Sequence, residues 1–183
     1  MTKKEAILHA ALKLLVKKGV HNTPMSEIAK AAGTGMGTIY NYFPNKEALI
    51  NAIYLRIRER EEALFLEVDT DKPIKSQFEN YLTVLIEFFI EHPSYFQFME
   101  HLHASPIITK ENKARGGKSE EMVALLLKKG QKERIIKNIG IDELLMFIGG
   151  TISAYLRWYF TKQKAKPSSL KNQIQMVWDG IKG

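Results

Sequence analysis

The sequence predicts an all-α protein of about nine helices, and three observations predict this fold class. Apolar residues recur at helical spacing in nearly every segment of the 183-residue chain. Glycine or proline stands at most of the points where one periodic segment gives way to the next. No segment shows strand-like alternation of comparable quality, and no internal repeat of about 20 to 50 residues is present.

The first helix is expected from about residue 3 to residue 18. Gly19 follows it and suits a left-handed C-terminal stop. Its apolar residues share one face at i, i+3, i+4, i+7 and i+8, namely Ile7, Ala10, Ala11, Leu14 and Leu15.

Two short helices follow. Thr23 is expected to cap the second, with Pro24 at its first position and Gly33 at its end. A helix of about two turns is unstable alone, so this one must be held by its neighbours. The third helix stops at Pro44. Its apolar positions are Met36, Ile39, Tyr40 and Phe43, a spacing that places Tyr40 and Phe43 in the core.

The fourth helix is capped by Asn45 and is expected to reach about Val68. The turn-prone residues 69–73 mark a boundary. Later helices are expected at about 74–91, ended by His92 and Pro93, and within SYFQFMEHLHAS at 94–105. Three more are expected at about 119–130, at 142–162 and, after a linker at 166–169, up to Ile181, whereas residues 104–118 have no clear assignment.

The stretch AAGTGMGTIYNYF, residues 31–43, places glycines at three alternate positions. A phosphate-binding glycine loop needs a strand before it, and the Walker pattern also needs a following Gly-Lys pair. Here a short helix precedes the glycines and no lysine follows Gly37. Two short helices that meet at a glycine-containing turn are instead typical of a helix-turn-helix, whose second helix enters the DNA major groove.

The charge distribution favours a nucleic-acid partner for the N-terminal part. The whole chain carries a net charge of +7, and residues 1–48 hold seven lysines against three glutamates, a net +4 in about a quarter of the length. The chain has no cysteine, which excludes disulfides and zinc–thiolate sites. Neither a signal peptide nor a membrane span is apparent, so we expect a cytoplasmic protein without a membrane partner.

Residues 23–50, TPMSEIAKAAGTGMGTIYNYFPNKEALI, resemble the DNA-binding unit of the TetR/AcrR family of transcriptional regulators. The shared features are IAKAAG, GTIYNYF and NKEAL, and the resemblance is specific over residues 5–55. It implies a helix-turn-helix DNA-binding domain at 1–48 and an effector-binding and dimerisation domain at 49–183, with the fourth helix, about 45–68, linking them. Members often have a Val-Ser pair where this chain has Thr34 and Gly35.

Position in these motifs indicates the DNA-contacting residues. The resemblance implies that Thr38 and Tyr42 contact DNA. Lys46 lies where a phosphate would meet the first turn of the fourth helix. Asn41 lies between the first two, and Thr23 has a hydroxyl that can serve as a cap, a DNA contact or both. The complete predicted set is Thr23, Thr34, Gly35, Met36, Gly37, Thr38, Asn41, Tyr42 and Lys46.

The larger half is expected to hold a ligand and a partner subunit. Dense aromatic residues there indicate either an apolar or aromatic effector or simply a packed core. The predicted pocket comprises Phe78, Tyr81, Leu85, Phe88, Phe89, Tyr95, Phe96, Met99, Met122, Ile152 and Tyr155. The resemblance implies that the last two helices form a four-helix dimer interface, predicted at Ile148, Ile152, Leu156, Tyr159, Ile174, Val177, Trp178 and Ile181.

The function expected from these features is that of a ligand-responsive repressor. It would bind near-palindromic double-stranded operator DNA as a homodimer and would be released by a small apolar or aromatic effector. The alternatives are an activator, a DNA-binding protein without an effector, or an α-helical enzyme, although no catalytic set is apparent. No cofactor or metal is expected, because His101 and His103 are two positions apart on a helix and point in nearly opposite directions.

Overall fold

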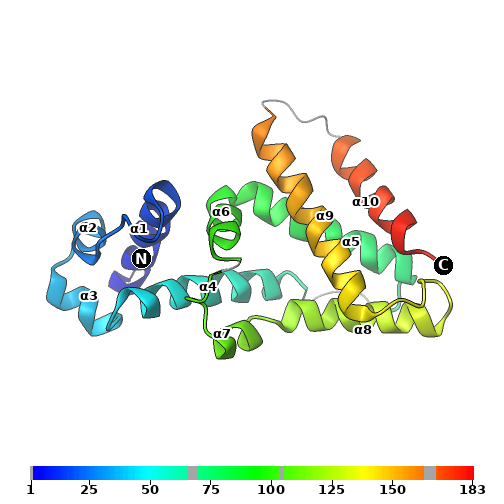
Figure 1. Cartoon of the computed structure of the whole chain (residues 1–183), viewed down its shortest axis with the longest axis horizontal. Coiled ribbons are helices and arrows are strands. Elements are labelled where there is room, and N and C mark those ends of the chain that lie inside the picture. Colours follow the sequence, from blue (N-terminus) through cyan, green and yellow to red (C-terminus); the bar gives the residue numbers. More distant parts are fainter. Residues whose placement is uncertain (1, 66–69, 104, 163–167) are drawn as a thin grey trace. The chain divides into compact units, whose positions relative to one another are not determined.

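The computed structural model describes residues 2–65, 70–103, 105–162 and 168–183, and these residues form helices joined by turns and short loops (Figure 1). The all-α prediction is confirmed, with ten helices in the described residues in place of about nine. The additional helix falls in the stretch that had no assignment. The helices are α1 Lys3–Lys18, α2 Met25–Ala31, α3 Met36–Tyr42, α4 Lys46–Ala63, α5 Ile74–Glu91, α6 Pro93–Leu102, α7 Lys110–Arg115, α8 Lys118–Lys132, α9 Ile141–Thr161 and α10 Ser168–Ile181.

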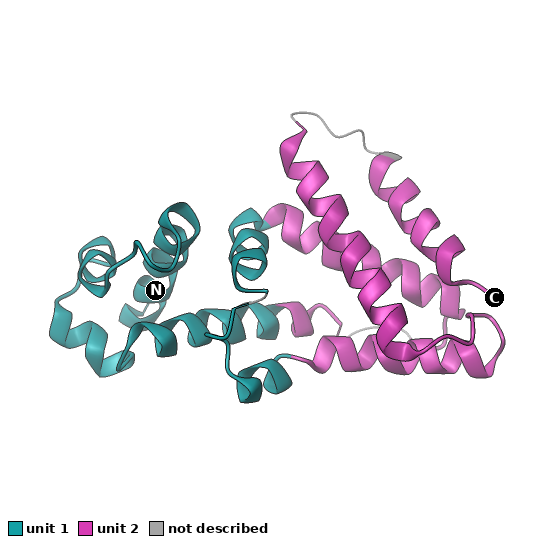
Figure 2. Cartoon of the chain, in the orientation of Figure 1, with its two compact units in different colours: residues 1–60, 92–116 teal, residues 61–91, 117–183 magenta. Residues whose placement is uncertain are grey.

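The chain divides into two compact units (Figure 2). Unit 1 comprises residues 1–60 and 92–116, and unit 2 comprises residues 61–91 and 117–183. Helices α6 and α7 therefore group with the N-terminal helices, and α4 contributes to both units. The predicted division of functions between residues 1–48 and 49–183 stays a prediction.

In unit 1, α1 packs against α2 and α6. Its bounds agree with the predicted ones, and a capping box between Thr2 and Glu5 defines its start. Gly19 ends it with a φ of 79°, a conformation that favours glycine. Buried side chains from four helices form the core of this part, including Ile7, Ala11, Leu15, Ile28, Ile39, Leu49 and Ile50.

The sequence predicted the start of α4 correctly but not its end. The predicted cap at Asn45 is confirmed, because its Oδ1 accepts a hydrogen bond from the Ala48 N–H at 2.7 Å. The predicted end near Val68 is wrong, since α4 ends at Ala63 and Leu64 and Phe65 form a turn. Val68 itself lies outside the described residues.

Unit 2 packs α5, α8, α9 and α10 around an apolar core. Phe78 of α5 lies against Trp178 of α10, with ring centroids 5.7 Å apart. An isolated antiparallel bridge between Ile136 and Lys182 joins the loop after α8 to the end of the chain. None of the described helices is long and apolar enough to cross a membrane.

Candidate nucleic-acid interface

A glycine at the end of α2 sets the turn of the helix-turn-helix. Gly33, which the sequence placed at the end of this helix, has a φ of 65°, a left-handed conformation that favours glycine. The Gly33 N–H donates to the Lys30 carbonyl at 3.2 Å, and the Thr34 N–H donates to the Ala29 carbonyl at 2.9 Å. This pair of hydrogen bonds is a Schellman motif, which satisfies the last carbonyls of α2 and turns the chain toward α3.

Thr23 has a different role from the predicted one. Pro24 occupies the N-cap of α2, and no side chain caps that helix. Thr23 is 0% exposed, and its hydroxyl donates to the Gly19 carbonyl at 2.8 Å. The predicted cap is therefore wrong. The side chain instead joins the end of α1 to the start of α2, where it is fully buried.

Helix α3 begins at Met36 without a side-chain cap. Gly35 is its N-cap, with φ −81° and ψ 161° and no hydrogen bond from a side chain. Neither Gly35 nor Gly37 has an atom of the chain within 4 Å of the place where a Cβ would stand. Packing inside the chain therefore does not require glycine at either position, and their small size leaves the outer side of α3 open to an approaching surface.

The two sides of α3 differ in what they contact. Ile39 is fully buried and fixes the helix to the core. Gly37 and Asn41 are exposed and lie about 160° around the helix from Ile39, given 100° per residue. They therefore form the outermost line of the helix. Met36 and Tyr40 flank this line on one side, and Thr38 and Tyr42 flank it on the other.

Tyr40 is the residue that the sequence pattern misplaced. It is 47% exposed, so its prediction as a core residue is wrong, whereas Phe43 is buried as predicted. Tyr42 is 44% exposed and lies beside Phe43, with ring centroids 6.4 Å apart. Four apolar residues at helical spacing suggested a single buried face, but a helix of seven residues turns only part of that face toward the core.

Lys46 is neither buried nor freely solvated. Its Nζ donates to the carbonyl oxygen of Val20 at 2.8 Å, which ties the first turn of α4 to the loop before α2. A nearby ion pair also fastens α1 to α2, between Lys18 and Glu27 at 2.5 Å. Together with the hydrogen bond of Thr23, these two contacts hold α2 and the loop before it to α1 and α4.

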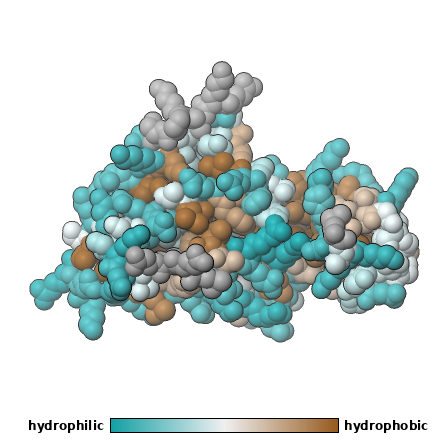
Figure 3. Space-filling view, turned by 180° about the vertical axis from the view of Figure 1, so that it is seen from behind, coloured by the Kyte–Doolittle hydropathy of each residue, from teal (hydrophilic) through white to brown (hydrophobic). Residues whose placement is uncertain are grey.

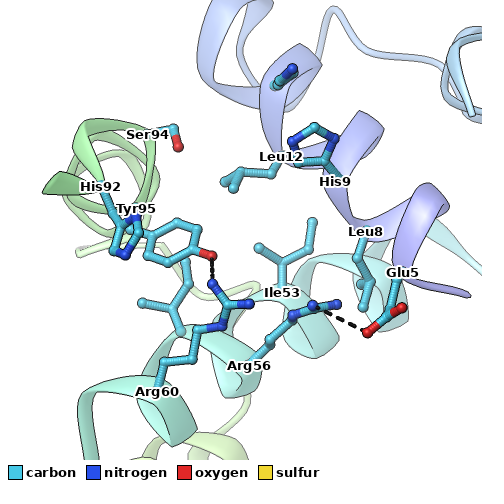
Figure 4. Close-up of a pocket in the computed structure, with 12 residues that line it drawn as sticks. Glu5, Leu8, His9, Leu12, Ile53, Arg56, Arg60, His92, Ser94 and Tyr95 are labelled. Atoms are coloured by element: carbon cyan, nitrogen blue, oxygen red, sulfur yellow. Dashed lines mark hydrogen bonds and ion pairs between the residues drawn. The ribbon is translucent and has the colours of Figure 1, made fainter. Parts of the chain in front are cut away.

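The residues predicted to line an effector pocket fall into both compact units. Tyr95, Phe96 and Met99 belong to α6 in unit 1, and the others belong to α5, α8 and α9 in unit 2. In unit 2 most of them are core side chains, namely Phe78, Leu85, Phe88, Phe89, Ile152 and Tyr155, whereas Tyr81 is half-buried and Met122 exposed. Of the whole predicted set, only Tyr95 lines the cavity found in unit 1 (Figure 4). That cavity is lined mainly by α1 and α4, which the sequence did not indicate.

The residues predicted for the dimer interface are mostly buried within the single chain. Ile148, Ile152, Leu156, Ile174, Val177, Trp178 and Ile181 are buried among the helices of unit 2, and Tyr159 is half-buried. Helical spacing identified the inner face of α9 and α10 and not the outer one. On the outer side of α9, Met146, Gly150 and Ala154 repeat at i, i+4 and i+8 and are exposed.

Apolar residues are also visible at the surface over unit 2 in Figure 3. Large exposed examples on α9 and α10 are Met146, Phe147, Trp158 and Met176. Among the described residues, no group of three histidine, aspartate or glutamate side chains is placed to hold a metal ion.

Comparison with known proteins identifies the N-terminal segment. Residues 7–53 match the family model described as bacterial regulatory proteins, tetR family. The chain is 35% identical over 95 residues to the HTH-type transcriptional regulator YuxN of Bacillus subtilis (strain 168), a match that covers 51% of this chain and 32% of that protein. In the first three curated relatives, the matched segment spans only 26% to 32% of their length.

Solved structures resemble the whole fold. A tetR family transcription regulator from Shewanella sp. PV-4 superposes with a TM-score of 0.88 at 23% identity, over 100% of both chains. The transcriptional regulator FadR from Bacillus subtilis, solved in complex with stearoyl-CoA, superposes with a TM-score of 0.79 at 20% identity, over 97% of this chain and 98% of that one. These similarities extend the shared architecture through α10.

Proposed function

We propose that this chain, a member of the TetR family of bacterial transcriptional regulators, is a repressor that binds a near-palindromic operator as a homodimer and releases it when a small effector binds. The observation that carries the proposal is the outer side of α3. It presents one glycine, an asparagine and three large side chains from a helix whose buried side is fixed by Ile39. A B-DNA major groove of about 12 Å admits such a helix.

The roles on α3 follow from position and chemistry. Gly37 and Asn41 lie on the outermost line, so the backbone can approach a base edge there and the amide of Asn41 can donate and accept hydrogen bonds. Thr34, Gly35, Met36, Thr38 and Tyr42 complete the proposed contact surface around them. We add Tyr40 to the proposed surface because it is exposed beside Met36, and we omit Thr23 because it is buried.

Lys46 is proposed as a phosphate contact. Its ammonium group has three N–H donors and gives one to Val20, so two remain for a phosphate oxygen. The free N–H groups at the start of α4 attract the same anion. The surplus of lysines in residues 1–48 adds attraction that does not depend on DNA sequence.

The homodimer is proposed to form through the outer sides of α9 and α10. Met146 is 72% exposed and Met176 is 62% exposed, and Gly149 and Gly150 leave open space beside α9. A twofold dimer brings two recognition helices about 34 to 36 Å apart, which is one turn of DNA. The resemblance to FadR bound to stearoyl-CoA supports an effector with a large apolar part.

The test is DNA binding by matched variants. An electrophoretic mobility shift with the promoter DNA next to the chain's own gene is expected to show a complex that weakens steeply with salt. Asn41→Ala is expected to weaken specific binding by about 1–3 kcal/mol, while Asn172→Ala, an exposed asparagine on α10, leaves it unchanged. Equal binding by both variants would contradict the proposed role of α3.

Repression and activation are separated by transcription from the same promoter in a purified system. A repressor lowers transcript yield when the chain is added, and an effector restores it. An increase in yield on addition of the chain would favour an activator. A DNA affinity that no ligand changes would favour a DNA-binding protein without an effector.

A further inference from the structure

Unit 1 contains a cleft of about 400 Å³, and none of the proposed DNA-contacting residues lines it (Figure 4). It lies between α1, α4 and the first turn of α6. Its volume falls in the range of about 300 to 1,000 Å³ that is typical of small-molecule sites.

The inner wall of the cleft is apolar and firmly held. Leu8 and Leu12 contribute from α1, and Ile53 and Ile57 contribute from α4. All four side chains are buried, so they belong to the core of unit 1 and present a fixed apolar surface at the bottom of the cleft. Such a wall favours a hydrocarbon body over a polar one.

The rim of the cleft is predominantly cationic. Arg56 and Arg60 are one turn apart on α4, and both guanidinium groups project toward the cleft in Figure 4. Lys13 of α1 adds a third positive charge, and Glu5 is the one carboxylate among the lining residues. These three cationic side chains and one carboxylate together carry a net charge of +2.

The contacts of the two arginines leave them able to bind an anion. Arg56 forms an ion pair with Glu5 at 3.6 Å between Nη2 and Oε1, which is a long separation for a half-exposed pair. Arg60 donates to the hydroxyl oxygen of Tyr95, and its guanidinium carbon lies 5.7 Å from the centre of that ring. Tyr95 in turn lies against His92, with ring centroids 4.9 Å apart.

We propose that this cleft binds an amphipathic anion, which has one acidic head group and an apolar tail. The head group lies between Arg56 and Arg60, where a carboxylate or phosphate accepts hydrogen bonds from both guanidinium forks. The tail lies along the apolar wall formed by Leu8, Leu12 and Ile53. The head group competes with Glu5 for Arg56, so binding weakens the ion pair that joins α1 to α4.

The position of the cleft suggests what binding does. Helix α1 packs on α2 of the helix-turn-helix and also on α6, so one helix contacts both the DNA-binding element and the cleft (Figure 1). A ligand that changes the link between α1 and α4 alters the support of α2 and α3. This part of the inference rests on the proposed function and identifies the class of effector and its site.

The test begins with binding to the full-length chain in the absence of DNA. Isothermal titration calorimetry below the micelle concentration is expected to show binding of dodecanoate or dodecyl phosphate, and the tighter of the two identifies the head group. Dodecanol, which lacks the charge, and acetate, which lacks the tail, are each expected to bind at least about tenfold more weakly, a difference of about 1.4 kcal/mol.

Variants locate the site. Arg56→Gln and Arg60→Gln are each expected to weaken binding of the amphipathic anion at least about tenfold, while Arg115→Gln, at an exposed position on α7, leaves it unchanged. Ser94→Phe fills the cleft from α6 without removing a charge and is expected to abolish binding. Unchanged circular dichroism in all four variants excludes misfolding as the cause.

Three results would overturn the inference: no binding of either anion, equal binding of dodecanol, or unchanged binding in both arginine variants.

The anion that binds in the calorimetry is expected to lower DNA affinity in the mobility shift at least about fivefold. Because the calorimetry contains no DNA, it tests the site even if the chain proves not to bind the promoter. The mobility shift without ligand tests the proposed function alone.

Discussion

The ammonium group of Lys46 donates a hydrogen bond to the carbonyl oxygen of Val20 across 26 positions of the chain, at 2.8 Å. This contact fastens the first turn of α4 to the loop between α1 and α2. A lysine at this position was predicted only as a phosphate contact. The structure adds a structural role. The two roles can be separated by experiment, because the hydrogen bond to Val20 affects the free energy of unfolding and a phosphate contact affects DNA binding.

Lys46→Met is expected to reduce both stability and DNA binding. Loss of the hydrogen bond to Val20 lowers the free energy of unfolding by about 0.5–1.5 kcal/mol, measured by urea denaturation. Loss of one phosphate contact reduces the slope of log K against log salt by about 0.9. Lys128→Met, at an exposed position of α8, serves as the control for net charge. A salt slope that changes equally in both variants would remove Lys46 from the DNA interface.

Gly33 and Gly37 are expected to respond in opposite ways to alanine. At Gly33 the φ of 65° is unfavourable for an L-residue, so Gly33→Ala lowers the free energy of unfolding by about 1–2 kcal/mol. Gly37 is helical with open space around it, so Gly37→Ala raises stability by about 0.5–1 kcal/mol.

The DNA affinity of Gly37→Ala is expected to change in the opposite direction to its stability. The methyl group at position 37 projects from the outer side of α3, so Gly37→Ala is expected to weaken specific DNA binding despite the higher stability. Mobility shifts and thermal melts on the same samples check both effects. If Gly37→Ala binds DNA as tightly as the unaltered chain, the backbone at Gly37 does not approach the groove closely.

Thr23→Val is expected to affect folding and not DNA contact. The valine has nearly the same shape but cannot donate to the Gly19 carbonyl, so the free energy of unfolding falls by about 1–2 kcal/mol. DNA affinity measured well below the melting temperature stays unchanged because the side chain is buried. Thr38→Val, which removes a hydroxyl from the half-exposed flank of α3, supplies the contrast. A loss of DNA affinity in Thr23→Val, with the fold intact, would show that Thr23 contributes to the DNA interface.

The helices were largely predictable because their signals are local. Helical spacing, Gly19, Gly33 and Asn45 indicated α1, the turn and the start of α4, and each indication agrees with the structure. α7 was missed because a six-residue polar helix has no apolar periodicity, and only Thr109, which caps it, marks its start.

The side-chain environments were less predictable because they depend on contacts distant in sequence. Periodicity indicates that a helix has an apolar face, but it does not indicate whether that face meets its own chain or a partner. Ile148 and Ile174 therefore suited an interface although both are core residues. The cleft in unit 1 combines residues near positions 8, 56 and 95, and no local pattern joins them.

The stability contributed by Glu5 is expected to depend on pH. The hydrogen bond from the backbone N–H of Thr2, with its side-chain hydrogen bond and the nearby Arg56, holds the pKa of the Glu5 carboxyl below its usual 4.5. Because the folded state has the lower pKa, the stabilisation is fully present above about pH 4.5 and is lost as the pH falls through the folded value. Urea denaturation of Glu5→Gln should differ from the unaltered chain at pH 7 and converge with it at acidic pH. Glu133→Gln, at an exposed position after α8, provides the comparison.

Met146→Glu is expected to dissociate the proposed dimer without unfolding the subunit. Because Met146 is 72% exposed, the substitution costs little within the chain, whereas two carboxylates brought together by a twofold axis repel each other and lose solvation. Sedimentation equilibrium should show a dimer dissociation constant raised at least about tenfold. Leu125→Glu, at a position of α8 that is 65% exposed, makes the same chemical change away from α9 and α10 and should leave the dimer intact. If Leu125→Glu dissociates the dimer and Met146→Glu does not, the interface lies on α8. If the unaltered chain is monomeric at all concentrations, the proposed dimer is wrong.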